Sequence, residues 1–234
     1  MENKRPQKVV VLSGAGMSAE SGIKTFRDAN GLWEGHDVMS VASPEGWQRD
    51  PQLVTDFYNQ RRLQLGKVQP NAGHEALSML ESAVPTVIIT QNVDDLHERA
   101  GSRNIIHLHG ELTKMRSSVY EKDVYELGYR KANFGDLCPK GTLLRPHIVW
   151  FGEPVPMMDA AIAQVASADV LIVVGTSLEV YPAAGLLNYL PLDKPIYVID
   201  PNRHDDLRLS GLTLIKSTAA KALPALVNRI LNGF

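Results

Sequence analysis

The chain reads VVVLSGAGMSA over residues 9–19. The run of valines that ends at Leu12 is typical of a parallel strand buried on both faces. Gly14, Gly16 and Ala19 then fit the pattern G-x-G-x-x-G/A, whose small residues let a loop and a helix N-terminus approach a pyrophosphate. This pattern alone is weak, because a ligand-free turn between a strand and a helix can look the same. The stretch therefore predicts an α/β fold and leaves a dinucleotide site open.

Patterns of buried strands and amphipathic helices alternate along the rest of the chain. Apolar runs predict further strands at residues 86–90, 169–174 and 196–199. Helical spacing predicts helices at residues 51–66, 71–83 and 218–231. Asn71 is the expected cap of one helix, and another helix is expected to start at Val93. Strands that alternate with helices indicate a Rossmann-like parallel sheet with helices on both faces.

Two stretches interrupt this alternation, and we assign both to one domain that spans residues 1–234. Residues 24–70 are interpreted as a loop and helical insertion, because they contain no convincing strand. Residues 111–145 are polar and lack a regular period, so they are interpreted as a small lobe.

The composition argues against several classes of protein. The 234 residues are 44% hydrophobic and 21% charged, and the formal net charge of -2 indicates neither nucleic acid nor an anionic membrane as partner. The single cysteine, Cys138, cannot form a disulfide within the chain. Residues 1–8 lack the apolar core of a signal peptide, and no apolar run approaches the roughly 18 residues of a membrane span. We therefore expect a cytoplasmic protein that binds neither nucleic acid nor membrane.

The residues after the glycine loop disfavour an ordinary NAD dehydrogenase. Such enzymes place an acidic residue at the end of a second strand, about 20 residues after the loop. Here residues 25–33 read TFRDANGLW, which is typical of a loop. The sequence therefore allows a dinucleotide but does not support hydride transfer.

Five motifs, in order along the chain, carry a more specific signal. They are GAGMSAESGIKTFR at 14–27, QNVD at 91–94, HG at 109–110, RPHIVWFGE at 145–153 and GTS at 175–177. Together they resemble the motifs of the sirtuins, the NAD-dependent protein deacylases, across nearly the whole chain. The resemblance implies an enzyme that strips acyl groups from protein lysines and yields nicotinamide, free lysine and 2′-O-acyl-ADP-ribose. Acylated proteins or peptides are then the expected partners.

The resemblance assigns catalysis to His109 and Asn92. In sirtuins a histidine acts as general base on a ribose hydroxyl, and an imidazole with a pKa of about 6.5 suits that role near neutrality. His107 is the main rival, because residues two apart share a face if the segment is a strand. A purely structural histidine is the other alternative. Asn92 and Asp94 resemble contacts to the ribose and to the nicotinamide carboxamide, whereas helix capping is the alternative for Asn92.

The resemblance also implies an NAD site that draws on several motifs and on two later segments. Asp200 and Asn202 depart from the family pattern, in which Asn is often followed by Glu two residues on, and Ala219 matches by position only. The expected NAD-binding residues are Gly14, Ala15, Gly16, Ser18, Glu20, Ile23, Phe26, Arg27, Gln91, Asn92, Asp94, Gly175, Thr176, Ser177, Asp200, Asn202 and Ala219.

Residues 149–153 resemble the sirtuin segment that pairs with the substrate backbone by strand addition. Val149, Phe151 and Gly152 are therefore the expected substrate contacts. Trp150 and Phe151 fit equally well as aromatic side chains of the core, and the sequence does not separate these two interpretations.

Most sirtuins hold a structural zinc ion with two Cys-x-x-Cys pairs in the small lobe. The corresponding positions are approximately Ser117, Tyr120, Cys138 and Gly141, so a single thiolate is present. One thiolate cannot form that tetrahedral site, and we predict no structural zinc and no other bound metal. Apolar packing and hydrogen bonds are expected to hold the lobe. The candidate side chains for this packing are Tyr120, Val124, Tyr125, Leu127, Tyr129 and Phe134.

Residues 58–61 read YNQR and resemble the Tyr-x-x-Arg pair of sirtuins that prefer negatively charged acyl groups. On a helix, Tyr58 and Arg61 share a face, so a hydroxyl and a guanidinium can meet one carboxylate. Succinyl and malonyl groups end in such a carboxylate. The alternative is a packed tyrosine beside a solvated arginine, since Arg62 follows directly and helix surfaces often carry such charges.

Three functions compete for the same motifs. We predict removal of acyl groups, succinyl and malonyl as well as acetyl, because His109 and Asn92 are both present. A non-catalytic module that binds NAD or ADP-ribose is the first alternative. ADP-ribosyl transfer to a protein is the second, because it uses the same activated ribose with another nucleophile.

Overall fold

The computed structural model of the chain describes residues 5–24, 32–202 and 210–233. Its largest element is a six-stranded sheet with the strand order β11-β10-β9-β1-β4-β5, in which all neighbours are parallel. The strands are β1 (Val9–Ser13), β4 (Thr86–Thr90), β5 (Ile105–His107), β9 (Val170–Val174), β10 (Ile196–Ile199) and β11 (Leu212–Ile215). The predicted Rossmann-like parallel sheet is confirmed.

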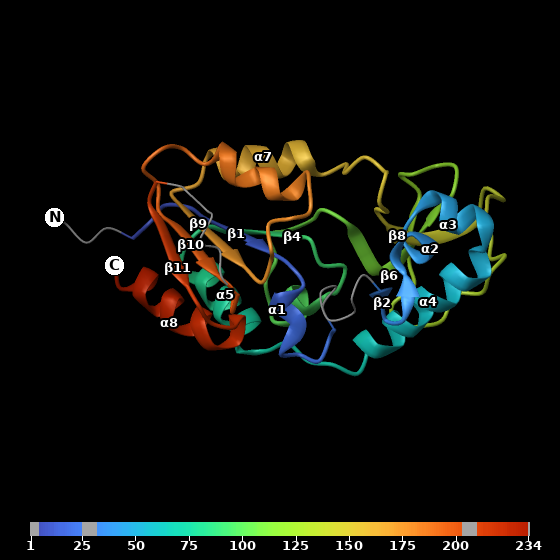
Figure 1. Cartoon of the computed structure of the whole chain (residues 1–234), viewed down its shortest axis with the longest axis horizontal. Helices are drawn as coiled ribbons and strands as arrows, with labels where there is room; N and C mark the ends of the chain where they lie inside the picture. The colour runs from blue at the N-terminus through green and yellow to red at the C-terminus, as the bar shows by residue number, and fades with distance from the viewer. Residues whose placement is uncertain (1–4, 25–31, 203–209, 234) are drawn as a thin grey trace.

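Helices cover both faces of this sheet, because successive side chains of its central strands point into two different apolar layers. They are α5 (Ala72–Ala83), α8 (Ala219–Leu231), α7 (Met158–Ala166) and the 3-10 helix η2 (Ala183–Tyr189). Val9 and Val11 of β1 lie in the layer of α5 and α8, whereas Val10 and Leu12 lie in the layer of α7 and η2. Figure 1 shows α7 above the sheet and α5 and α8 below it. None of the helices among the described residues is both long and apolar enough to span a membrane.

The ends of the predicted elements agree with the structure in most places. Asn71 is the N-cap of α5 as predicted: its side-chain oxygen accepts from the N–H of Gly73 at 2.9 Å, and its own N–H donates to Nδ1 of His74 at 3.2 Å. The side-chain bond satisfies a backbone donor that a helix N-terminus leaves free. The expected helix start at Val93 is wrong, because α6 (Leu96–Arg99) begins later and a loop precedes it.

The insertion between the first and second strands of the main sheet contains more regular structure than expected. A short hairpin of β2 (Leu32–Trp33) and β3 (His36–Asp37) was not predicted, because strands of two residues leave no periodic pattern. Three helices follow: α2 (Val38–Val41), α3 (Pro44–Arg49) and α4 (Pro51–Leu65). The last of these confirms the helix predicted at residues 51–66. Phe57 of α4 packs with Leu112 and Ile148 in a third apolar cluster, which joins the insertion to the lobe.

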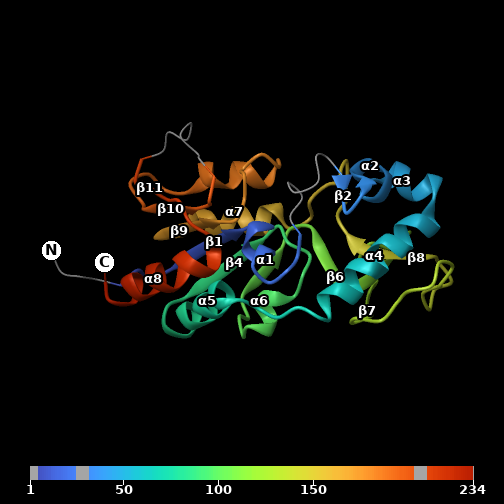
Figure 2. The ribbon, with the colours of Figure 1, turned by 60° about the horizontal axis from the view of Figure 1, so that its bottom comes forward.

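The lobe is built on an antiparallel sheet with the strand order β7-β6-β8. Its strands are β6 (Gly110–Ser117), β7 (Val124–Glu126) and β8 (Leu144–Ile148). Figure 2 shows them beside α4 and away from the main sheet. Residues 111–145, interpreted as a small lobe, therefore contain regular strands that their sequence pattern did not predict. Partly buried positions alternate irregularly with buried ones along β6, so the strand has no clean period in its sequence.

Polar side chains of α4 attach the lobe to this helix. Arg62 donates from Nε to the carbonyl oxygen of Leu112 at 2.8 Å and from Nη1 to Oδ1 of Asn59 at 2.7 Å. Asn59 in turn bonds to both backbone groups of Ala132. Four of the side chains expected to pack the lobe are exposed instead, so that part of the prediction is wrong. They are Tyr120, Val124, Tyr129 and Phe134.

Candidate active site

Four strand ends meet at one edge of the main sheet. β1, β4, β9 and β10 each continue into a loop at its carboxyl end, and these loops begin at Gly14, Gln91, Gly175 and Asp200. They line a cavity of about 750 Å³ that is also lined by α4 and by the segment after β8. Open parallel sheets bind ligands at the carboxyl ends of their strands, and cavities of several hundred Å³ are common for such sites.

The loops that begin at Gly14 and Gly175 can approach each other closely only because glycines occupy positions 14, 16 and 175. The N–H of Gly16 donates to the carbonyl oxygen of Gly175 at 2.8 Å. A Cβ on Gly14 would lie 2.7 Å from Cβ of Thr176. A Cβ on Gly175, whose φ is +64°, would lie 2.3 Å from a backbone nitrogen of α1 (Gly16–Ala19), a helix of a single turn. The small residues therefore let two loops pack backbone against backbone, which lines this part of the cavity with peptide groups.

A buried polar cluster lies where α1 meets the loop after β4. Oγ of Ser18 donates to Oδ2 of Asp94 at 2.8 Å and accepts from Nδ2 of Asn92 at 3.2 Å. Burial raises the pKa of Asp94 to about 6, against the lowering effect of the Ser18 bond. The carboxyl oxygens suit a carboxamide N–H as donor. Because α6 begins only at Leu96, the alternative that Asn92 caps a helix is wrong.

His109 lies just beyond β5 and lines the cavity. Its Nδ1 is 2.9 Å from the carbonyl oxygen of Gln91, and since a carbonyl can only accept, Nδ1 carries the proton. The neutral ring then keeps its lone pair on Nε2. Burial lowers the pKa of His109, and the bond to Gln91 offsets only part of that effect. The imidazole is therefore neutral at pH 7, which is the state that a general base requires.

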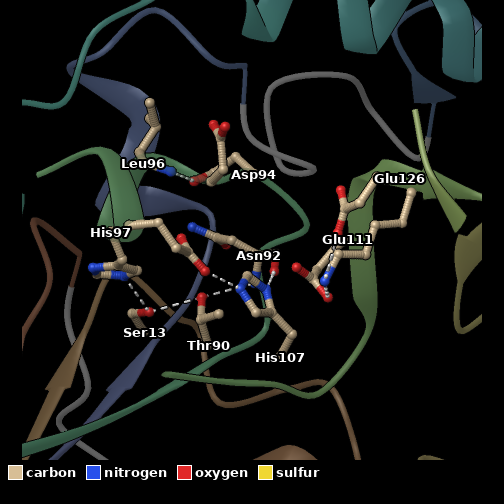
Figure 3. Close-up of polar contacts among 12 residues, drawn as sticks. Ser13, Thr90, Asn92, Asp94, Leu96, His97, His107, Glu111 and Glu126 are labelled. Atoms are coloured by element: carbon tan, nitrogen blue, oxygen red, sulfur yellow. Dashed lines mark hydrogen bonds and ion pairs between the residues drawn. The ribbon is translucent and has the colours of Figure 1, made fainter. Parts of the chain in front are cut away.

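His107 is engaged with other acceptors. Its Nδ1 lies 3.3 Å from the carbonyl oxygen of Asn92, and its Nε2 lies 2.7 Å from Oε1 of Glu98. Figure 3 shows the ring beside Asn92. Burial lowers the pKa of His107, but the hydrogen bond and charge of Glu98 outweigh burial and leave the pKa raised. Among the described residues that line the cavity, His109 is present and His107 is not.

Tyr58 and Arg61 of α4 line the same cavity. Tyr58 is fully buried, and its hydroxyl oxygen accepts from Nε1 of Trp150 at 3.0 Å. Nη1 of Arg61 lies 3.6 Å from Oε1 of Glu34, and the guanidinium carbon is 5.3 Å from the ring centre of Phe57. Burial lowers the pKa of Arg61 more than the charge of Glu34 raises it. The Arg61 side chain is only 15% exposed, so the alternative of a solvated arginine is wrong.

The two aromatic residues after β8 differ in their surroundings. Both residues line the cavity, but Trp150 is 2% exposed and belongs to the apolar cluster under α4, whereas Phe151 is 42% exposed. Backbone bonds hold the segment on both sides. The N–H of Val149 donates to the carbonyl oxygen of His109 at 2.9 Å, and the N–H of Phe151 donates to the carbonyl oxygen of Ala42 at 2.9 Å. Trp150 is thus both a core residue and part of the cavity wall, whereas Phe151 belongs to the cavity wall and not to the apolar cluster.

Acidic side chains lie near the loop after β10 and the start of α8. Oδ1 of Asp200 accepts from the backbone N–H of Asn202 at 2.8 Å and from its Nδ2 at 2.9 Å. Oε2 of Glu20 accepts from the N–H of Ala220 at 2.9 Å, in the first turn of α8. These bonds order polar groups at the end of the cavity formed by β10 and α8.

The cavity gathers every candidate residue that the structure describes, while Phe26 and Arg27 lie outside the described residues. Those that line it are Gly14, Ala15, Gly16, Ser18, Glu20, Ile23, Tyr58, Arg61, Gln91, Asn92, Asp94, His109, Val149, Phe151, Gly152, Gly175, Thr176, Ser177, Asp200, Asn202 and Ala219. Sequence reasoning missed Glu34 and Tyr181, which also line it. Tyr181 follows the GTS loop closely and could have been found from that motif, whereas no sequence pattern marks Glu34.

Comparison with known proteins decides the family. Residues 14–182 match the model described as the Sir2 family. The chain belongs to the Sir2 family. A relative named NAD-dependent protein deacylase from Helicobacter pylori is 54% identical over 225 residues, which are 96% of this chain and 98% of the relative. Another of the same name, from Bacteroides thetaiotaomicron, is 51% identical over 228 residues and covers 94% of this chain and 96% of its own length.

Solved structures of the Sir2 family share the fold. A Sir2 homologue in complex with NAD is 40% identical and superposes with a TM-score of 0.86, covering 96% of this chain and 90% of that chain. A Sir2 protein bound to an acetylated peptide is 26% identical with a TM-score of 0.78, covering 96% and 93%.

Thr142 links Ser117 and Cys138, two of the four small-lobe positions that correspond to the zinc ligands of most sirtuins. Oγ1 of Thr142 lies 2.6 Å from Oγ of Ser117 and 3.0 Å from Sγ of Cys138. Within residues 5–24, 32–202 and 210–233, one group of three His, Cys, Asp or Glu side chains has ligand atoms within 4.8 Å of one another. That group consists of Glu98, His107 and Glu111, and it includes none of the four positions. A lobe without metal stays a prediction.

Proposed function

We propose that this Sir2-family enzyme removes acyl groups from protein lysines with NAD as its cosubstrate, and that succinyl and malonyl groups are among them as well as acetyl groups. The composition of a single cavity carries the proposal. A neutral imidazole, that of His109, and a largely buried guanidinium, that of Arg61, line it together. The imidazole suits proton abstraction from a sugar hydroxyl, and the guanidinium suits a carboxylate at the end of an acyl chain.

The chain is an NAD-dependent enzyme, and the donors and acceptors of the cavity fit that cosubstrate. Gly14 and Gly16, whose own N–H groups donate to Val174 and Gly175, carry no side chains and so leave space beside their loop for a pyrophosphate. The buried carboxyl of Asp94 suits the carboxamide N–H of nicotinamide, and Asp200 and Asn202 suit the hydroxyls of a ribose. NAD supplies a ribose carbon whose bond to nicotinamide breaks as the acyl oxygen of the substrate lysine attacks it.

His109 is the proposed general base in this reaction. Its Nδ1 proton is committed to Gln91, so Nε2 is the atom that takes the proton of a ribose hydroxyl. Asn92, held by Ser18, is proposed to orient that ribose. The expected products are nicotinamide, free lysine and 2′-O-acyl-ADP-ribose, with one water molecule consumed. The peptide that carries the lysine is proposed to add along residues 149–152 as an extended strand.

Unused donors support an acidic acyl group as substrate. Nε and Nη1 of Arg61 are buried and find no hydrogen-bond partner among the described residues, and such donors are costly to leave unmet. Tyr58 accepts from Trp150, which leaves its own hydroxyl proton for an acceptor. A carboxylate between Tyr58 and Arg61 would satisfy both groups. Truncating one side of such a pair costs about 2–5 kcal/mol, which is roughly 30-fold to several thousandfold in rate.

We propose a single catalytic domain over residues 1–234, in which residues 24–70 form an insertion and the lobe at 111–145 folds without a metal ion. Two observations support a metal-free lobe. Thr142 links Ser117 to Cys138 by short contacts, and Arg62 and Asn59 bond the lobe to α4.

Mass spectrometry of two matched peptides, one with acetyl-lysine and one with succinyl-lysine, tests the proposed function. Each is incubated with and without NAD. NAD-dependent loss of succinyl with formation of O-succinyl-ADP-ribose is the expected result. Loss of acetyl alone would keep the deacylase and refute the acidic pocket. No loss of either group, with NAD still bound, would favour a binding module, and ADP-ribose attached to the peptide would favour a transferase.

A further inference from the structure

Glu34 brings a carboxylate of the chain itself into the cavity. It lies in the turn between β2 and β3, where its φ of +51° is a left-handed conformation that few residues other than glycine adopt. Its side chain is 16% exposed and lines the cavity together with Arg61. The turn thus presents an acidic side chain to the guanidinium that is proposed to bind the acyl group.

Glu34 and Arg61 form an ion pair without a hydrogen bond. Oε1 and Nη1 are 3.6 Å apart, which is longer than an N–H···O bond. Nε and Nη1 of Arg61 have no hydrogen-bond partner within the part of the chain that the structure describes. Glu34 therefore supplies a compensating charge to Arg61 but leaves the donors of the guanidinium available to another acceptor.

Glu34 also has a second cation within reach. Its Oε2 lies 3.3 Å from Nζ of Lys24, whose side chain is 68% exposed. Lys24 lines the cavity as well. The carboxylate can therefore move from Arg61 toward Lys24 without losing every ionic partner.

We infer that Glu34 is a specificity-determining residue: it competes with an acyl carboxylate for Arg61 and so limits the preference for acidic acyl groups over acetyl. The inference rests on the proposed function and deepens it. With an acetyl substrate, Glu34 compensates the largely buried guanidinium. With a succinyl substrate, two carboxylates approach one guanidinium, and like charges at short range oppose each other.

Glu34→Gln removes the competing charge and keeps the size of the side chain. We expect the kcat/KM for a succinyl-lysine peptide, divided by that for the acetyl-lysine peptide, to rise on the order of tenfold, or about 1.4 kcal/mol. A succinamyl-lysine peptide, which ends in a neutral amide, is the matched substrate. The kcat/KM for the succinamyl peptide, divided by that for the acetyl peptide, should stay near the wild-type value in this variant, because the repulsion needs a charge on the acyl group.

Glu34→Asn is the second variant, because asparagine adopts left-handed conformations more readily than most residues and preserves the turn. Thermal unfolding of both variants checks that they fold. We expect the succinyl-to-acetyl ratio to rise in both.

Three results would overturn the inference. A ratio that falls would mean that Glu34 orients Arg61 for the acyl carboxylate, and an unchanged ratio would mean that the two carboxylates do not compete. Neither of these two results would contradict the desuccinylation proposed for the wild-type protein. If the wild-type protein and both variants remove acetyl but never succinyl, the acidic pocket itself fails, and the role of Glu34 fails with it.

Discussion

Substituting each of the neighbouring arginines Arg61 and Arg62 by methionine should separate acyl selectivity from folding stability. Methionine keeps an unbranched side chain and removes the charge. Arg61 lines the cavity, whereas Arg62 is 1% exposed and donates to Leu112 and Asn59. Because the two residues are adjacent on α4, each variant serves as the matched control for the other.

Two opposing effects determine the stability of the Arg62→Met variant. The substitution removes two hydrogen bonds from a charged donor to oxygen, each worth about 1.5–3 kcal/mol, and a longer one to the sulfur of Met115, and it leaves the carbonyl of Leu112 without this donor. Burial acts in the other direction. It lowers the pKa of Arg62 to about 10, which corresponds to about 3 kcal/mol of desolvation that methionine avoids. We expect a net loss of about 2 kcal/mol in the free energy of unfolding, or about 4–8 °C in Tm.

Thermal unfolding followed by circular dichroism measures the stability, and kcat/KM with acetyl and succinyl peptides measures the selectivity. Arg62→Met should lower Tm and affect both substrates alike. Arg61→Met should lower the succinyl-to-acetyl ratio by about 30-fold or more, with a smaller change in Tm. The reasoning is refuted if Arg62→Met unfolds at the wild-type temperature, or if Arg61→Met lowers kcat/KM equally for both peptides.

Three further predictions follow from the site, the core and the lobe. His109→Ala should abolish deacylation and keep NAD binding, because the base at Nε2 is lost while the other proposed NAD contacts stay. Calorimetric titration with NAD measures the binding. Retained turnover would exclude His109 as the base. Burial lowers the pKa of His74 from 6.5 to about 4, so the unfolded chain binds the proton first and stability falls as pH falls through this range. The free energy of unfolding measured with urea should fall by about 2 kcal/mol between pH 8 and about pH 5 because of His74, and His74→Gln should reduce that fall. An equal pH dependence of stability in both proteins would contradict this assignment. Incubation with EDTA should leave Tm unchanged, because Thr142 links Ser117 and Cys138 without an ion, and a lower Tm would reveal a structural metal.

The main sheet and the location of the site could be predicted from local patterns. Strands buried on both faces, such as β1 and β9, are marked by uninterrupted apolar runs, since no exposed face introduces polar residues. The loops that begin at Gly14 and Gln91 follow two such runs. Parallel pairing brings their ends together, however long the connection between the strands. The spacing of Tyr58 and Arg61 likewise predicted a shared helical face, and both residues line the cavity.

Elements with an exposed face or with few residues were missed. β11 is an edge strand with partly exposed positions, and the strands of the lobe mix buried and exposed residues without a clear period. The hairpin of β2 and β3 is too short to leave any periodic pattern. β6 also pairs with β8, which lies far along the chain, so local sequence carries little information about that pairing.

The pairing and protonation of the functional groups depend on contacts between residues that are distant in the sequence. Gln91 decides which nitrogen of His109 carries the proton, and Glu34 decides how the charge of Arg61 is compensated. Sequence patterns can identify an imidazole, a guanidinium and a glycine loop as the chemical groups of a site. They cannot identify the acceptor that each group meets, because hydrogen bonds and ion pairs act over a few ångströms and only the folded chain brings such partners within that distance.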